Sequence, residues 1–401
     1  MRCRRTCAGI QSLGARALIP WDLLSTAIRW LDHRSGDFHV EPTLKNRTVP
    51  ANNFTVIVVD GAEFPMGLHS MLIECDILEA SNPWDRLYAL LGLITRGPAL
   101  GPRPVIIAVY TKPLKDVYAH ATRLAIQESR DLYLLGYMAP DLTEADDAIS
   151  DDSDWPSWVP RYHQNMEQDV WVTNSSESAS SSELVEAKLM RDTGEPDNDV
   201  LTLHGVTFDV IDSIAFPLGP MVSDQNGLPR FPWSLLVWKI APNASERSIW
   251  SIAEALVGGY HGVNRTAVDQ ADLNADFAAS MRRVHGLSIP TNSVLEGLLN
   301  ATSTTYGDAD RYQGEIIQIA RNSLARMRNG KYCIVQRAVA AGDAVCVLFG
   351  GQVPFVMRQG SESIWRLRGV AYVPGIMQGE YIDELDGQGR LQAETSTFDI
   401  R

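Results

Sequence analysis

The chain has 401 residues, of which 45% are hydrophobic and 21% are charged, a composition typical of a globular protein with a substantial core. Its formal charge of −14 leaves no basic excess to neutralise phosphates, which argues against nucleic acid or an anionic membrane as the main partner. No uninterrupted apolar run reaches about 18 residues, so the sequence predicts no membrane span.

The N-terminal stretch is basic at first and then amphipathic. Its first 20 residues contain four arginines and no acid. Transit peptides have this composition, but a chain that begins inside a larger unit would show it equally. Pro20 opens a helical pattern, and "FTVIVVDG" at residues 54–61 predicts a buried strand that ends in an Asp-Gly turn.

Four residues between these two elements are of types that bind metal ions: Asp32, His33, Asp37 and His39. A zinc site needs ligands that converge on the ion, normally from more than one segment. A polar loop between a helix and a strand accounts for these residues as well. We therefore expect no metal centre.

A helix start is indicated at residues 82–94, "NPWDRLYALLGLI". Asn82 suits the cap, Pro83 suits the first helical position, and Asp85 brings a carboxylate to free backbone N–H groups. Apolar side chains then recur at helical spacing and predict a buried stripe: Trp84, Leu87, Leu90, Leu91 and Ile94.

The first turn of this helix has two interpretations. Asp85 and Arg86 could form a functional pair, or they could cap the helix and pin it to its surroundings. We expect Asp85 to accept hydrogen bonds from backbone or arginine donors. We also expect Tyr88, Leu90 and Leu91 to be buried.

Three further elements follow. Residues 104–113 predict a strand or extended segment, and residues 131–138 predict another strand. Between them an amphipathic helix is indicated by Val117, Ala121, Leu124 and Ala125.

Polar tracts then interrupt the pattern. Residues 145–154 contain five aspartates, and residues 173–183 are rich in serine without a large apolar side chain. Such segments bury too little surface to offset chain entropy, so we expect a flexible loop over residues 166–199. Before it, Trp155 and Trp158 in "WPSWVPRY" either form a contact surface or anchor an irregular segment on the core.

The last half of the chain predicts strands, then helices, then strands. Residues 200–214 alternate apolar and polar side chains, residues 233–302 are mainly helical in pattern, and residues from about 331 are strand-rich. The expected fold is α+β, with helix-rich N-terminal and middle regions and a C-terminal antiparallel β-rich region or small barrel.

We divide the chain accordingly into four regions. A mixed α/β region carries the 82–94 segment, a flexible loop follows, a mainly helical region has leading strands, and a β-rich region completes the chain. Their boundaries are residues 1–165, 166–199, 200–330 and 331–401.

Motifs that would identify catalysis or a cofactor are missing from the sequence. It contains no phosphate-binding glycine loop, dinucleotide fingerprint, nucleophile elbow, zinc-protease motif or Cys-x-x-Cys pair. Its five cysteines are scattered, which favours reduced thiols in a cytoplasmic setting. We therefore assign no catalytic, cofactor-binding or metal-binding residue and lean against an enzyme.

Five segments, taken in order, resemble fungal heterokaryon-incompatibility (HET) domain proteins. The 82–94 segment is similar to their D-P-R-D-[KR]-[IV]-Y-A-L-L-G-L signature, matched by Pro83, Asp85, Arg86, Tyr88, Ala89, Leu90, Leu91, Gly92 and Leu93. The other four resembling segments are "VYTKPLKDVY" (109–118), "WPSWVPRY" (155–162), "GDAVCVLFGGQVPFVMR" (342–358) and "GVAYVPGIMQGE" (369–380). Two upstream blocks of the family's core domain are absent from this sequence. The chain thus resembles the downstream portion of these proteins, and we expect a truncated or divergent member.

The resemblance implies a fungal, cytoplasmic protein that acts in non-self recognition or its regulation through contacts with other proteins. Triggering programmed cell death would need the upstream domain, whose blocks are absent. Two alternatives are an enzyme or accessory protein recruited to secondary metabolism, and a remnant without independent function. No small-molecule ligand is indicated.

The family's upstream domain is related in fold to Toll/interleukin-receptor-like modules, some of which cleave NAD. We expect no such activity here, because that domain's first blocks are absent. Asp60, at the end of the predicted 54–61 strand, is the best remaining carboxylate for this chemistry.

Overall fold

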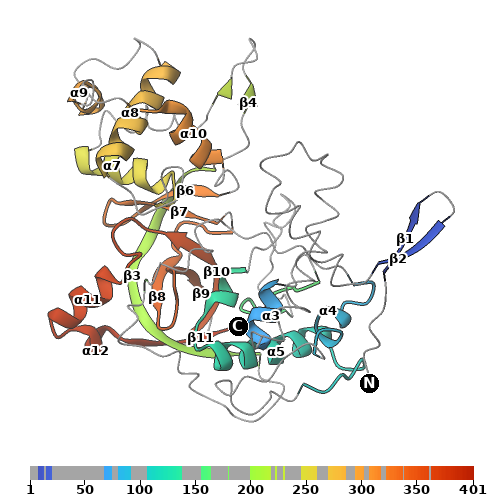
Figure 1. The fold of residues 1–401 in the computed structure, drawn as a ribbon. Coiled ribbons are helices and arrows are strands. Elements are labelled where there is room, and N and C mark those ends of the chain that lie inside the picture. Colours follow the sequence, from blue (N-terminus) through green and yellow to red (C-terminus); the bar gives the residue numbers. More distant parts are fainter. Residues whose placement is uncertain are drawn as a thin grey trace. The chain divides into compact units, whose positions relative to one another are not determined.

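The computed structural model describes residues 8–12, 15–19, 67–74, 80–91, 106–137, 155–163, 179, 199–217, 222–223, 229–230, 245–259, 270–285, 294–301, 307–317, 322–336, 338–360 and 363–401. Several expected features lie outside these residues: the helix from Pro20, the polar cluster at 32–39, the strand at 54–61 and most of the 166–199 loop. The chain divides into two compact units, residues 1–129 with 161–165, and residues 130–160 with 166–401. Its fold is α+β, as predicted, with a C-terminal β region (Figure 1).

The first unit combines a small hairpin with helices. Strands β1 (Ala8–Ser12) and β2 (Ala15–Ile19) pair antiparallel. The helices are α3 (Leu68–Glu74), α4 (Asp85–Tyr88) and α5 (Leu114–Ser129). The predicted amphipathic helix is confirmed as α5, which buries Val117, Ala121 and Ala125.

Helix α3 is held at its start by a side chain from the end of α5. The Glu128 carboxylate accepts hydrogen bonds from the backbone N–H groups of Leu68, at 2.7 Å, and His69, at 3.3 Å. A Cβ atom on Gly67 would lie 1.9 Å from a Glu128 carboxylate oxygen. Gly67 therefore leaves the space through which a residue distant in sequence caps the helix.

The second unit begins with a short helix where we predicted a strand. Residues Tyr133–Tyr137 form the 3-10 helix η2. Asp131 Oδ1 accepts from the Tyr133 N–H at 2.9 Å and starts the turn, while Leu132, Leu134 and Leu135 are buried. The strand prediction at 131–138 was wrong because a short apolar run does not distinguish a buried strand from a buried helical turn.

Six strands of this unit close into a barrel. They are β3 (Leu201–Pro217), β6 (Ser323–Met327), β7 (Tyr332–Val335), β8 (Ala344–Leu348), β9 (Phe355–Gln359) and β10 (Ile364–Tyr372). The sheet runs β10-β7-β6-β3-β8-β9, and β9 pairs again with β10. These six strands pair antiparallel, so the ring is closed and leaves no open edge between them.

A seventh strand, β11 (Ser396–Ile400), joins the sheet across its seam. It pairs antiparallel with the first residues of β3 and parallel with β10 at Ile364 and Trp365. The long strand β3 thus pairs with β11, β8 and β6 in succession along its length.

Strand β3 confirms the predicted strand at 200–214 but does not keep one buried face. Leu201 and Leu203 are buried as the alternation predicts, whereas the buried Val206 falls out of step with them and the buried Ile211 falls out of step with Val206. The register shifts between Thr207 and Asp209 and again beyond Ile211. A bulge inserts an extra residue and exchanges the two faces, which allows one strand to bend around the barrel.

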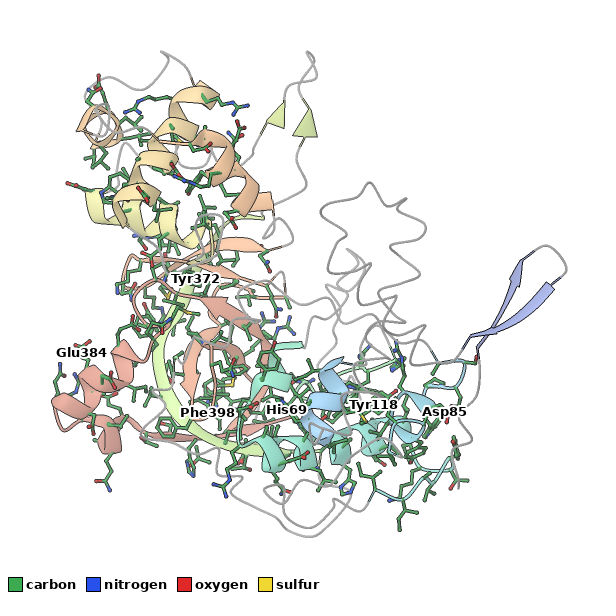
Figure 2. The ribbon with its side chains drawn as sticks, viewed as in Figure 1. His69, Asp85, Tyr118, Tyr372, Glu384 and Phe398 are labelled. Atoms are coloured by element: carbon green, nitrogen blue, oxygen red, sulfur yellow. The ribbon has the colours of Figure 1, made fainter. Side chains whose placement is uncertain are left out.

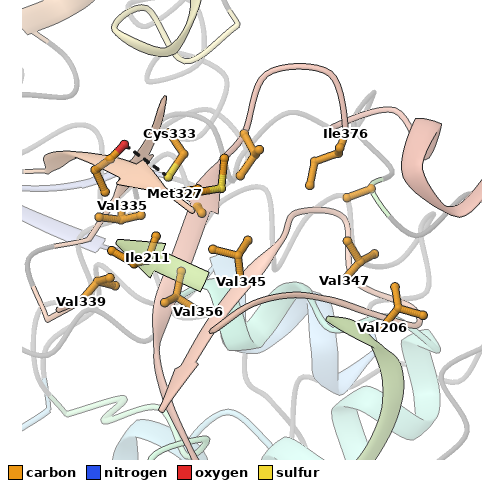
Figure 3. Close-up of a cluster of buried hydrophobic side chains, with 14 of the residues drawn as sticks. Val206, Ile211, Met327, Cys333, Val335, Val339, Val345, Val347, Val356 and Ile376 are labelled. Atoms are coloured by element: carbon orange, nitrogen blue, oxygen red, sulfur yellow. Dashed lines mark hydrogen bonds between the residues drawn. The ribbon is translucent and has the colours of Figure 1, made fainter. Parts of the chain in front are cut away.

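The barrel interior is filled by aliphatic side chains from its strands and from helix α11 (Glu380–Gly387) (Figure 3). The labelled members in the close-up are Val206, Ile211, Met327, Cys333, Val335, Val339, Val345, Val347, Val356 and Ile376. Ala179, from the Ser-rich tract, belongs to the same cluster, and its N–H donates to the Gln352 carbonyl at 2.9 Å. Helix α12 (Leu391–Glu394) links α11 to β11.

Helices fill the chain between β3 and β6, after the short pair β4 (Val222–Ser223) and β5 (Pro229–Arg230). They are α7 (Glu246–Ala255), α8 (Gln270–His285), α9 (Val294–Ala301) and α10 (Ala309–Ile317). The mainly helical prediction for 233–302 is confirmed in the described part of that range. Tyr312 of α10 is fully buried and donates to the Ala253 carbonyl of α7 at 2.8 Å.

Candidate functional site

The segment singled out by sequence, residues 82–91, forms a tight turn followed by the short helix α4. Asn82 Oδ1 accepts from the Trp84 N–H at 3.1 Å, and the Asn82 carbonyl accepts from the Asp85 N–H at 2.9 Å. The predicted helix start at Asn82 was wrong by two residues: Asn82 forms an Asx turn, whereas the N-cap of α4 is Trp84 and the helix begins at Asp85. The regular helix itself ends at Tyr88, earlier than the pattern predicts.

Side chains of this turn hold the next described segment, residues 106–113. The Trp84 indole N–H donates to the Lys112 carbonyl at 3.0 Å, and the Tyr88 hydroxyl donates to the Val109 carbonyl at 3.2 Å. In return, the Tyr110 hydroxyl donates to Asp85 Oδ1 at 2.6 Å. The three hydrogen bonds hold a segment that contains no helix or strand and that turns at residues 109–112, where the Lys112 N–H donates to the Val109 carbonyl at 3.2 Å. The strand predicted at 104–113 is therefore not formed in the described part of that range.

Asp85 consequently has a different partner from the one we expected. Asp85 accepts from Tyr110, a side chain 25 residues away, and no side-chain capping bond forms at the α4 N-terminus. The hydrogen bond to Asp85 raises the pKa of Tyr110, which remains a neutral donor. Of the two interpretations of the Asp85–Arg86 pair, Asp85 fits the second, because it attaches the turn to a neighbouring segment through Tyr110.

The remaining signature residues differ in burial. Arg86, Leu87 and Tyr88 are buried, which confirms the prediction for Tyr88. Leu90 and Leu91 are half-buried, so the prediction that both are buried was wrong. Because α4 ends at Tyr88, these two side chains leave the helical stripe on which the prediction relied. Pro83 is half-buried, and Gly92 lies outside the described residues.

A buried group of aromatic side chains lies beneath the signature turn. Tyr118 of α5 is fully buried and donates to the Pro83 carbonyl at 2.6 Å. Its ring meets Tyr162 edge-on with centroids 5.1 Å apart, and the Tyr162 hydroxyl is 2.9 Å from Thr122 Oγ1. Burial raises the pKa of both tyrosines far above neutrality, so both hydroxyls stay protonated. Figure 2 labels Asp85 and Tyr118 in this unit. The arrangement fits a scaffold that fixes the turn.

The "WPSWVP" segment belongs to the second unit and contacts the barrel seam. Trp158 is fully buried, and its indole N–H donates to the Asp199 carbonyl at 2.8 Å. Trp155 is half-buried and donates to the Val159 carbonyl of its own segment at 2.9 Å. Of the two interpretations of this pair, Trp158 therefore acts as an anchor, and only Trp155 keeps surface for a contact.

Ser157, between the two tryptophans, bridges strand β10 and Arg401, the residue after β11. Its hydroxyl accepts from the Leu367 N–H at 2.8 Å and donates to the Arg401 carbonyl at 2.5 Å. Leu367 lies at the β10 bulge, where the pairing with β9 shifts register. Ser157 thus satisfies backbone groups at the irregular part of the barrel, a role that its sequence position did not indicate.

An ion pair between a buried aspartate and a half-exposed arginine joins two barrel strands within the 342–358 segment. Asp343, 1% exposed, accepts from Arg358 Nε at 2.6 Å and Nη2 at 3.0 Å, and from the Ala340 N–H at 2.8 Å. The sequence analysis identified this segment by its resemblance but did not predict that Asp343 and Arg358 form a pair. A signal was present in the sequence, because an acid that directly precedes a buried strand and an arginine near the end of the next strand can pair across them.

The described cysteines do not provide a nucleophile. Cys333 and Cys346 are free thiols buried in the barrel core. Burial raises the pKa of Cys346 to about 12 and raises that of Cys333 as well, so neither forms a reactive thiolate near neutral pH. Within the described ranges, no three His, Cys, Asp or Glu side chains are grouped to hold a metal ion.

The second unit is therefore a closed, mostly antiparallel barrel with a helical insertion. Residues 296–388 match the family model described as the Het-6 beta-barrel domain. This match links that part of the chain to fungal heterokaryon-incompatibility-type proteins, although it covers under a quarter of the 401 residues. The barrel extends beyond it, because β3 and β11 lie outside the matched residues. Comparison with curated proteins found no match, and neither did comparison with solved structures.

Proposed function

We propose that the chain is a cytoplasmic heterokaryon-incompatibility-type protein that acts in non-self recognition, or in its regulation, through contacts with other proteins. The observation that carries the proposal is the match of residues 296–388 to the Het-6 beta-barrel domain. Three features support it: the resemblance of the 82–94 segment to the family signature, the arrangement of that segment as a scaffold, and buried thiols that lack reactivity. None of the helices in the described part is long and apolar enough to cross a bilayer.

A fungal cell-fusion assay tests this proposal. The gene would be deleted, restored or overexpressed in one of two otherwise identical strains, and death of fused cells would be scored by uptake of a vital dye. We expect the frequency of viable fusions to depend on the gene. Equal frequencies in all three states, across a panel of partner strains, would refute a role in recognition.

Variants separate a contact role from a folding role. Trp155→Ala should change the fusion outcome while the protein keeps its abundance and melting temperature. Val294→Ala is the matched control, since Val294 is an apolar side chain of α9 that is 41% exposed. An unchanged outcome with Trp155→Ala would remove Trp155 from the contact surface.

The proposal includes no catalysis by the chain itself. Purified protein incubated with NAD should release no nicotinamide above the rate of a buffer control. Turnover that disappears in Asp60→Asn would contradict this expectation and favour an enzyme. Asp60 lies outside the described residues, so its role remains a prediction.

A further inference from the structure

Helix α7 meets the barrel through a carboxyl group at an unfavourable position. Glu254 lies in the last turn of α7, which contains no basic residue. The carbonyl groups at a helix C-terminus carry partial negative charge, so an acid there is destabilised in its ionised form. Glu254 is also partly buried between the helix and the barrel.

The partner of Glu254 on the barrel is Tyr372, the last residue of β10, labelled in Figure 2. The Tyr372 hydroxyl donates to Glu254 Oε1 at 3.2 Å, and the tyrosine is 3% exposed. Gly259, just after α7, has a φ of +74° and lies against this ring. A Cβ atom on Gly259 would be 2.3 Å from the Tyr372 hydroxyl oxygen. The end of α7 can therefore pack against Tyr372 only because residue 259 has no side chain.

Charges from two further elements act on Glu254. Glu380, the first residue of α11, repels the ionised carboxylate, and Lys331, between β6 and β7, attracts it. Strand β7 and helices α8 and α9 also pack on α7. Strand β7 begins with the titratable Tyr332, whose pKa is raised by burial, so its hydroxyl stays neutral. Asp276 of α8 is buried and already paired with Arg311, and α9 carries the acidic Glu296 in its first turn.

We propose that the contact of α7 with β10 is an acid-tightened latch, in which protonation of Glu254 strengthens the attachment of the helical insertion to the barrel. The neutral carboxyl keeps its place beside the Tyr372 hydroxyl without repulsion from Glu380 and the helix end. The ionised carboxylate is repelled by Glu380 and by the helix end, and its partly buried position deprives it of water. Ionisation therefore favours release of α7 toward water.

The sign of the pH dependence follows from the titration. Burial is the largest cause that raises the pKa of Glu254 in the closed state above its ordinary value of 4.5, and together with the charge of Glu380 it outweighs the Tyr372 hydrogen bond and Lys331, which lower it. The closed state therefore binds the proton more tightly than the open one. The stabilisation of the closed state by this proton is complete below the ordinary pKa of a glutamate, and it is lost as pH rises through the raised pKa of Glu254. Each unit of difference between the two states changes the opening equilibrium by about tenfold.

Hydrogen exchange followed by mass spectrometry on the full chain tests the latch. Exchange of peptides covering residues 245–259 would be measured from pH 5 to pH 8, with exposure times corrected for the intrinsic rate. We expect protection of this peptide to fall as pH rises, while peptides of β8 stay equally protected. Protection that is constant or that rises with pH would overturn the proposal.

Variants identify the titrating group. Glu254→Gln should abolish the pH dependence and hold the peptide at its acid-state protection. The matched control Glu246→Gln, at the exposed first turn of the same helix, should leave the dependence intact. Tyr372→Phe should move the midpoint to higher pH, because its hydrogen bond favours the ionised form, and Glu380→Gln should move it lower. A pH dependence that persists in Glu254→Gln would contradict the assignment.

Discussion

The ion pair of the buried Asp343 with Arg358 allows a quantitative test of the barrel. Arg358→Met removes two of the three hydrogen bonds to the Asp343 carboxylate and leaves the one from the Ala340 N–H. Hydrogen bonds to charged groups contribute about 1.5–3 kcal/mol each, and breaking a buried pair costs about 3–5 kcal/mol. The Arg358 side chain is 40% exposed, so solvent screening places the expected loss near the lower limit, about 3 kcal/mol.

Urea unfolding, followed by both tryptophan fluorescence and circular dichroism, measures this loss. A double-mutant cycle with Asp343→Asn isolates the interaction between the two side chains, for which we expect about 2 kcal/mol. The control Arg326→Met breaks a half-exposed pair with Asp212, 3.6 Å apart, and should cost between 0 and about 1 kcal/mol. A coupling energy no larger than in this control would refute the argument that burial makes the Asp343 pair strong.

Three further substitutions test packing and capping. Trp158→Ala should destabilise the second unit by about 3–5 kcal/mol, since the indole is fully buried, and a melting temperature close to that of the wild type would contradict its role as an anchor. Gly67→Ala should displace the Glu128 carboxylate and cost about 0.5–2 kcal/mol, seen as faster hydrogen exchange in α3; unchanged exchange would mean that the cap is unimportant. Leu87→Ala should cost about 2–5 kcal/mol and Leu91→Ala clearly less, because only Leu87 is fully buried. Equal losses in chemical denaturation would argue against the observed end of α4.

Local patterns predicted those elements whose structure depends on neighbouring residues. Asn82 started a turn, α5 followed from its apolar spacing, and the strands after residue 331 followed from β-branched runs between turn signals. Each of these signals lies within a few residues of the element that it predicts. The α+β class followed from their order along the chain.

Features that depend on distant partners could not be predicted in this way. Nothing local to Asp85 indicates Tyr110 as its donor, and nothing local to Ser157 indicates Leu367 and Arg401. Ala179 lies in a tract whose composition predicts a flexible loop, yet its side chain is buried in the barrel core. Composition describes the average tendency of a segment, whereas one small residue can fill a space that the rest of the fold creates.

The pairing of β3 with β11 has a consequence during synthesis of the chain. Thr202 and Asp399, hydrogen-bonded across these strands, are 197 residues apart in sequence. The first residues of β3 therefore leave the ribosome long before the strand that covers them has been made, and at about 5–20 residues per second this delay lasts on the order of ten seconds or more. An unpaired strand exposed for that time can join another chain. The six-strand ring can thus close once β10 has emerged, but the first residues of β3 stay uncovered until β11 follows, and a chaperone that shields them until then should raise the yield of folded protein.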